Sequence, residues 1–287
     1  GKTPLMVNRT VGARHLEAVQ NLSKVEVILS SWAFLDRLEN VDLEGIDHLL
    51  VMLEDVRRKL TIKDKLRALH RSKRNTHAVL KAFNLLEHSG EETAVLLFTS
   101  GTESLPKGVP LSHRNLLSNE KGLFDLIPFY GDDILLGMLP PFHSFGFSIT
   151  GIMSLLAGLR IFYFPDPTDG AKMAALVKEW DISVICGAPT FLKGIFKAGD
   201  AETFKKLRIC GTGAEKAPPE LFALVDQIGK EGVLVEGYGI TECAPILTFN
   251  TPGQPTIGVG KPVTGVELMI VHPESYDPLK QGESGLL

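Results

Sequence analysis

Residues 97–109 read LFTSGTESLPKGV, an apolar run that leads into a loop rich in glycine and hydroxyl side chains. In such a loop, backbone N–H groups and hydroxyls can converge on phosphate oxygens, and Lys107 adds a positive charge. The spacing from Gly101 to Lys107 matches the Walker loop, GxxxxGK followed by Ser or Thr, but Pro106 stands at the second glycine and Gly108 at the hydroxyl position. These residues also argue against a helix starting at the loop. The stretch therefore predicts a phosphate-binding loop outside the P-loop NTPase class.

On both sides of this loop, short apolar runs alternate with amphipathic stretches, a pattern typical of strands alternating with helices. Helix start signals lie between several runs: Ser112 precedes residues 114–126, Asp169 precedes residues 171–180, and a proline pair opens residues 219–228. The alternation predicts an α/β fold with largely parallel sheets flanked by helices on both faces. The expected strands are residues 25–29, 48–53, 94–99, 134–139, 160–164, 183–186, 207–210 and 233–236.

Two further turns carry groups that suit a nucleotide. Residues 235–242, VEGYGITE, follow a strand with a glycine turn that bears an aromatic ring, a hydroxyl and a carboxylate. A tyrosine face can stack on a purine, a threonine hydroxyl can hold a phosphate, and a glutamate can bind Mg²⁺. Residues 210–218, CGTGAEKAP, are a strand-to-helix turn in which glycines allow close backbone approach. Turns at the ends of parallel strands line the crevice where ligands bind, so both turns are expected at such a crevice.

These three segments, in this order, resemble the core motifs of the adenylate-forming superfamily of acyl-CoA synthetases, luciferases and peptide-synthetase adenylation domains. The family's first loop is usually written S/T-SGTTGxPKGV, and residues 99–109 match it apart from Glu103 and Ser104. YGITE at residues 238–242 matches the YGxTE motif in full, and LPPFHSFG at residues 139–146 resembles the LPxFH element. The GTESxPKG variant and the opening GKTPLMVN are most similar to bacterial acyl–acyl carrier protein synthetases, which are often fused to a 2-acylglycerophosphoethanolamine acyltransferase.

The resemblance implies a role for each motif residue. Thr241, Glu242, Lys107 and His143 are the candidate catalytic residues: Thr241 would contact the α-phosphate, Glu242 would hold Mg²⁺, and His143 would border the carboxylate. The nucleotide would be bound by Thr99, Ser100, Gly101, Thr102, Glu103 and Lys107 at the β- and γ-phosphates, by Gly213, Ala214 and Glu215 at the adenine, and by Tyr238 and Gly239 against the base.

Three of these residues also have plain structural interpretations, and one has no settled role. His143 could be a hydrogen-bonded core histidine, Tyr238 a packed aromatic ring, and Glu242 a charge at a helix N-terminus. Glu103 would repel a triphosphate unless it bound metal or turned away.

The reaction that the resemblance implies uses ATP, Mg²⁺ and a fatty acid. The fatty-acid carboxylate would attack the α-phosphate to give acyl-AMP and pyrophosphate, mainly through positioning and charge neutralisation. A thiol of acyl carrier protein would then displace AMP. Coenzyme A is the alternative acceptor, and a non-catalytic nucleotide-binding module is the alternative class of protein.

The resemblance also divides the chain. Residues 1–255 would form the α/β core for ATP and the acyl group, truncated at its N-terminus. Residues 256–287 would begin a small β subdomain, because residues 266–271 alternate apolar and polar side chains among glycines and prolines. The family's ribose-binding aspartate, its hinge and its mobile C-terminal domain, with the lysine that reaches the α-phosphate, are expected to be absent. We therefore expect the chain by itself to be inactive or nearly so.

The bulk composition predicts a cytoplasmic protein. A net charge of −4 gives no reason to expect nucleic acid as a partner. Cys186, Cys210 and Cys243 stand alone, without a CxxC or Cys/His cluster, which is typical of reduced thiols. No signal peptide is evident at the start. The longest apolar stretch, residues 145–159, is too short to span a bilayer and predicts a buried core helix.

Residues 57–74, called the basic segment below, contain nine lysines and arginines and one carboxylate, Asp64. The plainer interpretation is a solvated helix face, and the sequence alone favours it. The alternative is a docking surface for an anionic partner, either acyl carrier protein or the inner surface of the membrane.

Overall fold

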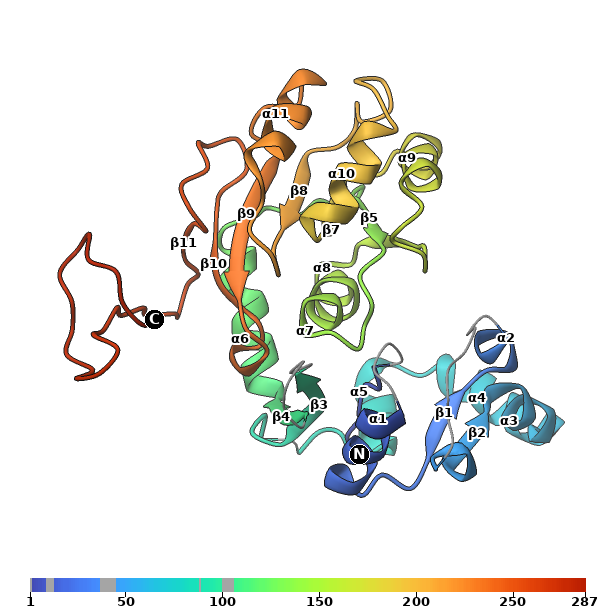
Figure 1. Ribbon diagram of the computed structural model, residues 1–287. Coiled ribbons are helices and arrows are strands. Elements are labelled where there is room, and N and C mark those ends of the chain that lie inside the picture. The colour runs from blue at the N-terminus through green and yellow to red at the C-terminus, as the bar shows by residue number, and fades with distance from the viewer. Residues whose placement is uncertain (1, 9–12, 37–44, 88, 100–105) are drawn as a thin grey trace. The chain divides into compact units, whose positions relative to one another are not determined.

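The computed structural model describes residues 2–8, 13–36, 45–87, 89–99 and 106–287. Its elements are labelled in Figure 1. The chain divides into two compact units, residues 1–114 and residues 115–287. This boundary separates the hairpin of the expected phosphate loop from the large sheet that follows it.

The first unit is built of short elements. β1 pairs with β2 in parallel, and β3 pairs with β4 antiparallel. The strands are β1 (Ile28–Ser30), β2 (Leu50–Met52), β3 (Thr93–Thr99) and β4 (Lys107–Ser112). The helices are α1 (Ala13–Ser23), α2 (Trp32–Leu35), the 3₁₀ turn η1 (Asp47–Leu49), α3 (Leu53–Lys59), α4 (Ile62–Ser72) and α5 (Thr76–Ala82).

The expected phosphate loop lies at the tip of the β3–β4 hairpin. Thr99 at the end of β3 is paired with Lys107 at the start of β4. A strand follows the loop, so the prediction that no helix starts there is confirmed. Ser100, Gly101, Thr102 and Glu103 lie outside the described residues.

The second unit contains a seven-stranded sheet of order β11-β10-β9-β8-β7-β5-β6. The five strands from β6 to β9 run parallel, while β10 and β11 add an antiparallel edge. This confirms the predicted α/β class with a largely parallel sheet. The strands are β5 (Ile134–Gly137), β6 (Arg160–Tyr163), β7 (Val184–Gly187), β8 (Ile209–Thr212), β9 (Leu234–Gly239), β10 (Ile246–Phe249) and β11 (Lys261–Pro262).

Helices cover both faces of this sheet, because successive side chains of its buried strands point to opposite sides. Ile185 and Cys210 pack on one face, against α9 (Gly170–Glu179), α10 (Pro189–Lys197) and α11 (Pro219–Gln227). Val184 and Ile209 pack on the other face, against side chains of α6 (His113–Phe124) and of the helical segment after β5. Figure 1 shows α9, α10 and α11 gathered on one side of the sheet.

The helix start signals in the sequence are confirmed by the contacts at the helix N-termini. The side chain of Asp169 accepts a hydrogen bond from the backbone N–H of Lys172 at 2.9 Å and so caps α9. Pro219 occupies the first position of α11, where its missing N–H costs nothing. α6 begins directly after β4, one residue earlier than expected.

The apolar stretch at residues 145–159 forms a helical run: α7 (Ser144–Gly146), the π-helix η2 (Phe147–Met153) and α8 (Ser154–Ala157). The expectation of a buried helix is correct for Ile149 and Met153 but wrong for Leu155 and Leu156, which are exposed. Ile149 and Met153 belong to the core on this face of the sheet, whereas the two exposed leucines lie in α8. None of the described helices is both long and apolar enough to cross a membrane.

Residues 266–271, whose alternating pattern predicts the start of a β subdomain, form no regular strand. Val271 alone makes isolated bridges there, with Pro278 and Leu286. Most side chains of this stretch are exposed, so the alternating pattern has no core to pack against. The division at residue 255 and the start of a β subdomain stay predictions.

Candidate functional site

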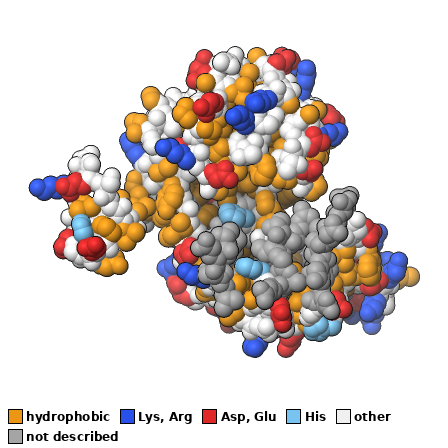
Figure 2. All heavy atoms as spheres, viewed as in Figure 1, with side chains coloured by type: hydrophobic (Ala, Val, Ile, Leu, Met, Phe, Trp, Pro, Cys, Tyr) orange, Lys and Arg blue, Asp and Glu red, His pale blue; other side chains and the backbone are white. Residues whose placement is uncertain are grey.

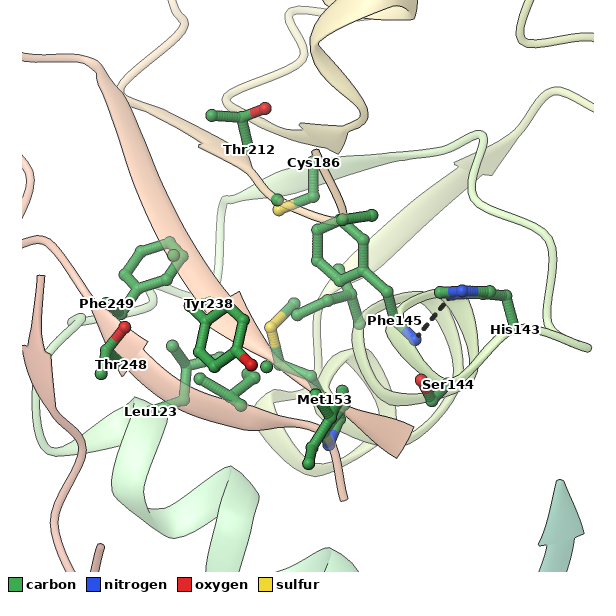
Figure 3. A pocket seen from close by; sticks show the side chains of 18 of the residues that line it. Leu123, His143, Ser144, Phe145, Met153, Cys186, Thr212, Tyr238, Thr248 and Phe249 are labelled. Atoms are coloured by element: carbon green, nitrogen blue, oxygen red, sulfur yellow. Dashed lines mark hydrogen bonds between the residues drawn. The ribbon is translucent and has the colours of Figure 1, made fainter. Parts of the chain in front are cut away.

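A cavity of about 310 Å³ opens in the second unit, where β8 and β9 end. The turn after β8 contributes Gly213 and Ala214, and the segment after β9 contributes Thr241 and Glu242. Figure 3 shows side chains from several elements pointing toward this cavity. The two glycine turns singled out in the sequence therefore meet at one site. This is the carboxyl edge of the parallel strands, where α/β proteins bind ligands.

The turn between β9 and β10 places a ring, a hydroxyl and a carboxylate at the cavity. Tyr238 lines it while 38% of its surface is exposed, so its ring remains open to a ligand. Thr241 and Glu242 follow in the 3₁₀ turn η3 (Thr241–Cys243). Gly239 is required at this point because a Cβ there would overlap the carbonyl oxygen of Pro245. The backbone thus turns back closely enough to bring all three side chains to the same opening.

His143 and Ser144 approach the same opening from α7. The Nδ1 atom of His143 accepts a hydrogen bond from the backbone N–H of Phe145 at 3.3 Å, which places the proton of the neutral ring on Nε2 (Figure 3). Surrounding atoms disfavour the charged imidazolium and lower the pKa of His143, although the ring keeps access to solvent. Ser144 Oγ lies 2.9 Å from Thr241 Oγ1. This hydrogen bond joins the two predicted catalytic segments.

The inner wall of the cavity is apolar. Leu123, Ile149, Met153, Val184 and Phe249 are buried and belong to the core on this face of the sheet. They come from α6, η2, β7 and β10, four elements that are distant in the sequence. The site therefore combines a polar opening with an apolar interior, as sites for small organic ligands usually do.

The predicted site residues fall into three groups. The cavity brings together His143, Gly213, Ala214, Tyr238, Gly239, Thr241 and Glu242. Glu215 is exposed and is not among the cavity-lining residues, so the structure does not bring it to the cavity. Thr99 and Lys107 belong to the first unit, paired across its hairpin.

Glu242 is the residue that could hold a metal. Among the described residues there is no group of three or more His, Cys, Asp or Glu side chains suited to a metal ion. Mg²⁺ commonly binds through one or two carboxylates and the phosphates of a substrate, so a single exposed carboxylate at a nucleotide site fits it. Glu242 is an exposed carboxylate at the opening of the cavity.

Among the cavity-lining residues without a role in the predicted site are Phe145 and Cys186. Phe145 stands in the LPPFHSFG motif, for which the resemblance implies a role only at His143. Cys186 was treated as an isolated thiol, although it ends a predicted strand, and strand ends form the crevice. Burial raises the pKa of the Cys186 thiol to about 12, so it stays protonated and acts as a small apolar wall.

Comparison with known proteins agrees with this geometry. The whole chain, residues 1–287, matches the family model described as AMP-binding enzyme. 4-Coumarate–CoA ligase 1 of Arabidopsis thaliana is 24% identical over 275 residues, which cover 92% of this chain and 48% of that protein. Long-chain-fatty-acid–CoA ligase of Bacillus subtilis (strain 168) is 29% identical over 167 residues, covering 55% of this chain and 29% of that protein.

A solved structure shares the fold along the whole chain. O-succinylbenzoate coenzyme A synthetase from Bacillus subtilis, in complex with AMP, aligns with a TM-score of 0.76 at 17% identity, covering 98% of this chain and 53% of that one. The chain thus spans about half the length of this protein and of the Arabidopsis ligase. With the family model matched from the first residue to the last, the chain belongs to the AMP-binding enzyme family of the adenylate-forming superfamily.

Proposed function

We propose that the protein activates a fatty acid with ATP and transfers the acyl group to a thiol. The carboxylate attacks the α-phosphorus of ATP, its bond to pyrophosphate breaks, and acyl-AMP remains. The thiol then attacks the acyl carbon, AMP leaves, and a thioester forms. The choice of a fatty acid as the substrate rests on the apolar side chains that line the interior of the cavity.

The cavity has nothing to receive a second charged group. Among the described residues that line it, none is lysine or arginine. A dicarboxylic acid would therefore bury a carboxylate without a partner, at a cost of several kcal/mol. An acid that ends in a hydrocarbon chain meets no such cost.

The hydroxyls of the wall are already engaged. Thr248 Oγ1 donates to the carbonyl of Val259 at 2.6 Å, and Thr212 Oγ1 donates to the carbonyl of Gly187 at 3.1 Å. Ser144 is joined to Thr241. Because the Thr212 and Thr248 hydroxyls donate to carbonyls, neither can donate to the hydroxyl of a phenolic acid, the substrate named for the Arabidopsis relative. This favours an aliphatic chain over a hydroxylated aromatic acid.

The opening of the cavity supports the ATP half of the reaction. Tyr238 offers a ring face to the adenine, the turn at Gly213 and Ala214 offers backbone, and Thr241 offers a hydroxyl to the α-phosphate. Glu242 would hold Mg²⁺, which supplies positive charge against the phosphates when bound. His143, neutral near pH 7, would border the carboxylate without repelling a cation. The resemblance assigns Lys107 and the loop sequence before it to the outer phosphates.

The acceptor is proposed from the loop sequence. The GTESxPKG variant at residues 101–108 resembles that of acyl–acyl carrier protein synthetases, which favours the carrier-protein thiol. Coenzyme A is the acceptor named for the curated relatives and is the second candidate. Thioester formation with each thiol, at matched acyl-AMP supply, separates the two.

The substrate class is tested by pyrophosphate release from the full-length protein with a panel of acids. Straight-chain acids from hexanoate to palmitate should support release, and malonate and 4-coumarate should not. Cys186→Leu replaces the sulfur by three carbons, a net gain of two heavy atoms in the cavity wall, and overpacking of this size costs roughly 1–3 kcal/mol. We expect kcat/KM for the longest active acid to fall about tenfold, with hexanoate nearly unchanged.

Hexanoate is the internal control, because a chain that stops short of Cys186 does not meet the added carbons. A uniform loss for all acids would mean that the leucine disturbs the fold, which thermal unfolding would reveal. An unchanged chain-length profile in a folded variant would place the acyl chain elsewhere. Release with malonate but not with aliphatic acids would overturn the substrate class.

A further inference from the structure

The basic segment sets the first unit apart in charge. Its nine lysines and arginines and one carboxylate give it a net charge of +8 within a chain of net charge −4, so the rest of the chain carries −12. The segment covers the last turn of α3, all of α4 and the two residues after it. Such a local concentration of one sign, against the sign of the whole, attracts an anionic partner.

Little of this charge is neutralised within the protein. In the part of the chain that the structure describes, Arg58 pairs with Asp55 at 3.4 Å and Arg67 with Asp64 at 3.5 Å. No carboxylate of the described residues lies within ion-pair distance of Lys63 or Lys65. Both lysines are exposed.

The structure adds an exposed apolar stripe to this charge. Ile62, Leu66 and Leu69 follow the i, i+4, i+7 spacing that places three side chains on one face of a helix. Their exposed fractions are 76%, 60% and 55%. Lys63 and Lys65 flank the stripe, since they lie on either side of Ile62 on the helix circumference. Figure 2 shows hydrophobic and basic side chains next to one another over α3 and α4.

α4 has no buried residue on any face, yet it is a well-formed helix. A capping box starts it: the Thr61 side chain accepts from the backbone N–H of Asp64 at 3.2 Å, and the Asp64 side chain accepts from that of Thr61 at 3.1 Å. The helix is therefore ordered locally, and none of the residues that the structure describes buries its apolar stripe. An isolated helix of eleven residues is only marginally stable in water. We therefore expect contact with an external surface to stabilise α4.

We propose that α4 lies on an anionic lipid surface, with its apolar stripe in the headgroup boundary and its lysines against the lipid charges. A basic helix of this composition, with apolar side chains along one face, is the type that lies in a membrane interface. An acidic protein such as acyl carrier protein would pair with the lysines and arginines, but its charge gives no reason for the exposed apolar stripe. The proposal stands apart from the substrate and the acceptor, since neither enters its argument.

The test is flotation of the full-length protein with vesicles of phosphatidylcholine, with and without phosphatidylglycerol. The charge variant is Lys63→Glu with Lys65→Glu, and the apolar variant is Leu66→Ser with Leu69→Ser. We expect each to weaken binding to the anionic vesicles at least tenfold. Salt should weaken the unchanged protein more than the charge variant, because the Debye length falls from about 10 Å at 0.1 M to about 3 Å at 1 M.

Matched controls lie in the second unit. Lys172→Glu with Lys178→Glu makes the same change of charge on exposed positions of α9. Leu155→Ser removes an apolar side chain that is 76% exposed. Neither should affect binding. All the tested side chains are exposed, so far-UV circular dichroism should stay unchanged in every variant.

Two results would overturn the proposal. If both variants of α4 bind anionic vesicles as the unchanged protein does, the helix is a solvated face. If the charge variant raises the KM for acyl carrier protein while vesicle binding stays the same, the surface is a protein-docking site. Loss of binding in the α4 variants alone would support the lipid contact.

Discussion

Glu120 in α6 is a carboxylate with none of its surface exposed. Its Oε1 accepts a hydrogen bond from Ser148 of η2 at 2.5 Å, and no described residue hydrogen-bonds its Oε2. Burial raises the pKa of Glu120 from its ordinary 4.5 to about 7, an effect that the Ser148 hydrogen bond only partly opposes. Because the folded state holds this proton more tightly than the unfolded state, folding is favoured where the proton is bound.

The consequence is a loss of stability as pH rises. The contribution of Glu120 is fully present below pH 4.5 and disappears as pH passes through about 7, a change of roughly 3 kcal/mol. Glu120→Gln keeps the shape and an acceptor for Ser148 but cannot ionise. We expect its Tm at pH 8 to exceed that of the unchanged protein by about 5–10 °C, with a small difference at pH 5.

Thermal unfolding between pH 5 and pH 8 measures this. Glu179→Gln, on the exposed side of α9, is the matched control and should leave the pH profile unchanged. Parallel profiles for Glu120→Gln and the unchanged protein would show that Glu120 is already ionised in the fold.

At the scale of elements, α6 fixes the turn that carries Thr241 and Glu242. Asn119 is buried, and its Nδ2 donates to the carbonyls of Ile246 at 2.6 Å and of Cys243 at 3.4 Å. Its Oδ1 accepts from the backbone N–H of Ile246 at 3.1 Å. One side chain thus holds both ends of the connection between η3 and β10. The position of the candidate metal and phosphate ligands depends on this contact.

Asn119→Leu should therefore affect both stability and the use of nucleotide. Leaving backbone groups of residue 246 unpaired costs roughly 1–3 kcal/mol. Because the turn would move or loosen, we expect the KM for MgATP to rise about tenfold, while the KM for the fatty acid changes little. Steady-state pyrophosphate release at varied MgATP measures the first effect, and thermal unfolding measures the second.

Asn250 provides the matched control. It is equally buried and makes three comparable bonds, donating to the carbonyls of Glu236 and Gly258 and accepting from the backbone N–H of Ile257. Two of these bonds fix a loop beyond β10 and the third joins it to β9, and none reaches η3, so Asn250→Leu should lose similar stability without the rise in KM for MgATP. An equal rise in the KM for MgATP in both variants would show that Asn119 contributes to stability only and does not position the turn.

At the scale of the whole molecule, the chain spans about half the length of the Arabidopsis ligase and of the solved synthetase. The resemblance assigns the lysine that reaches the α-phosphate to a mobile C-terminal domain. The second unit has its own two-sided core and its own cavity. Nucleotide binding and catalytic turnover can therefore be measured separately for residues 1–287.

We expect residues 1–287, as an isolated chain, to bind ATP but to release negligible pyrophosphate in the presence of a fatty acid. Fluorescence or calorimetric titration measures the binding, and a coupled pyrophosphate assay measures turnover. The long-chain-fatty-acid–CoA ligase of Bacillus subtilis serves as the active control. Multiple turnovers by the isolated chain would show that these residues suffice for adenylation.

Much of the fold could be predicted from local sequence. All eight expected strands occur within a few residues of their predicted positions. In β7 and β8, which are buried on both faces, the signal is a short apolar run between turn residues. Asp169 and the proline pair before α11 marked helix starts, since capping depends on a few neighbouring atoms. The alternating pattern at residues 266–271 forms no regular strand, because such a pattern needs a partner surface to become one.

For the candidate site as well, local sequence predicted one part and the tertiary structure was needed for the other. The sequence by itself determined the class of fold, the family motifs and the candidate ligands His143, Tyr238, Thr241 and Glu242, because these stand in contiguous motifs. Only the tertiary structure decided that Ser144 meets Thr241 across 97 positions and that Asn119 holds Ile246 across 127. It also decided that the stripe on α4 stays uncovered. Contacts between distant segments depend on how whole elements pack, and no local pattern of side chains records that packing.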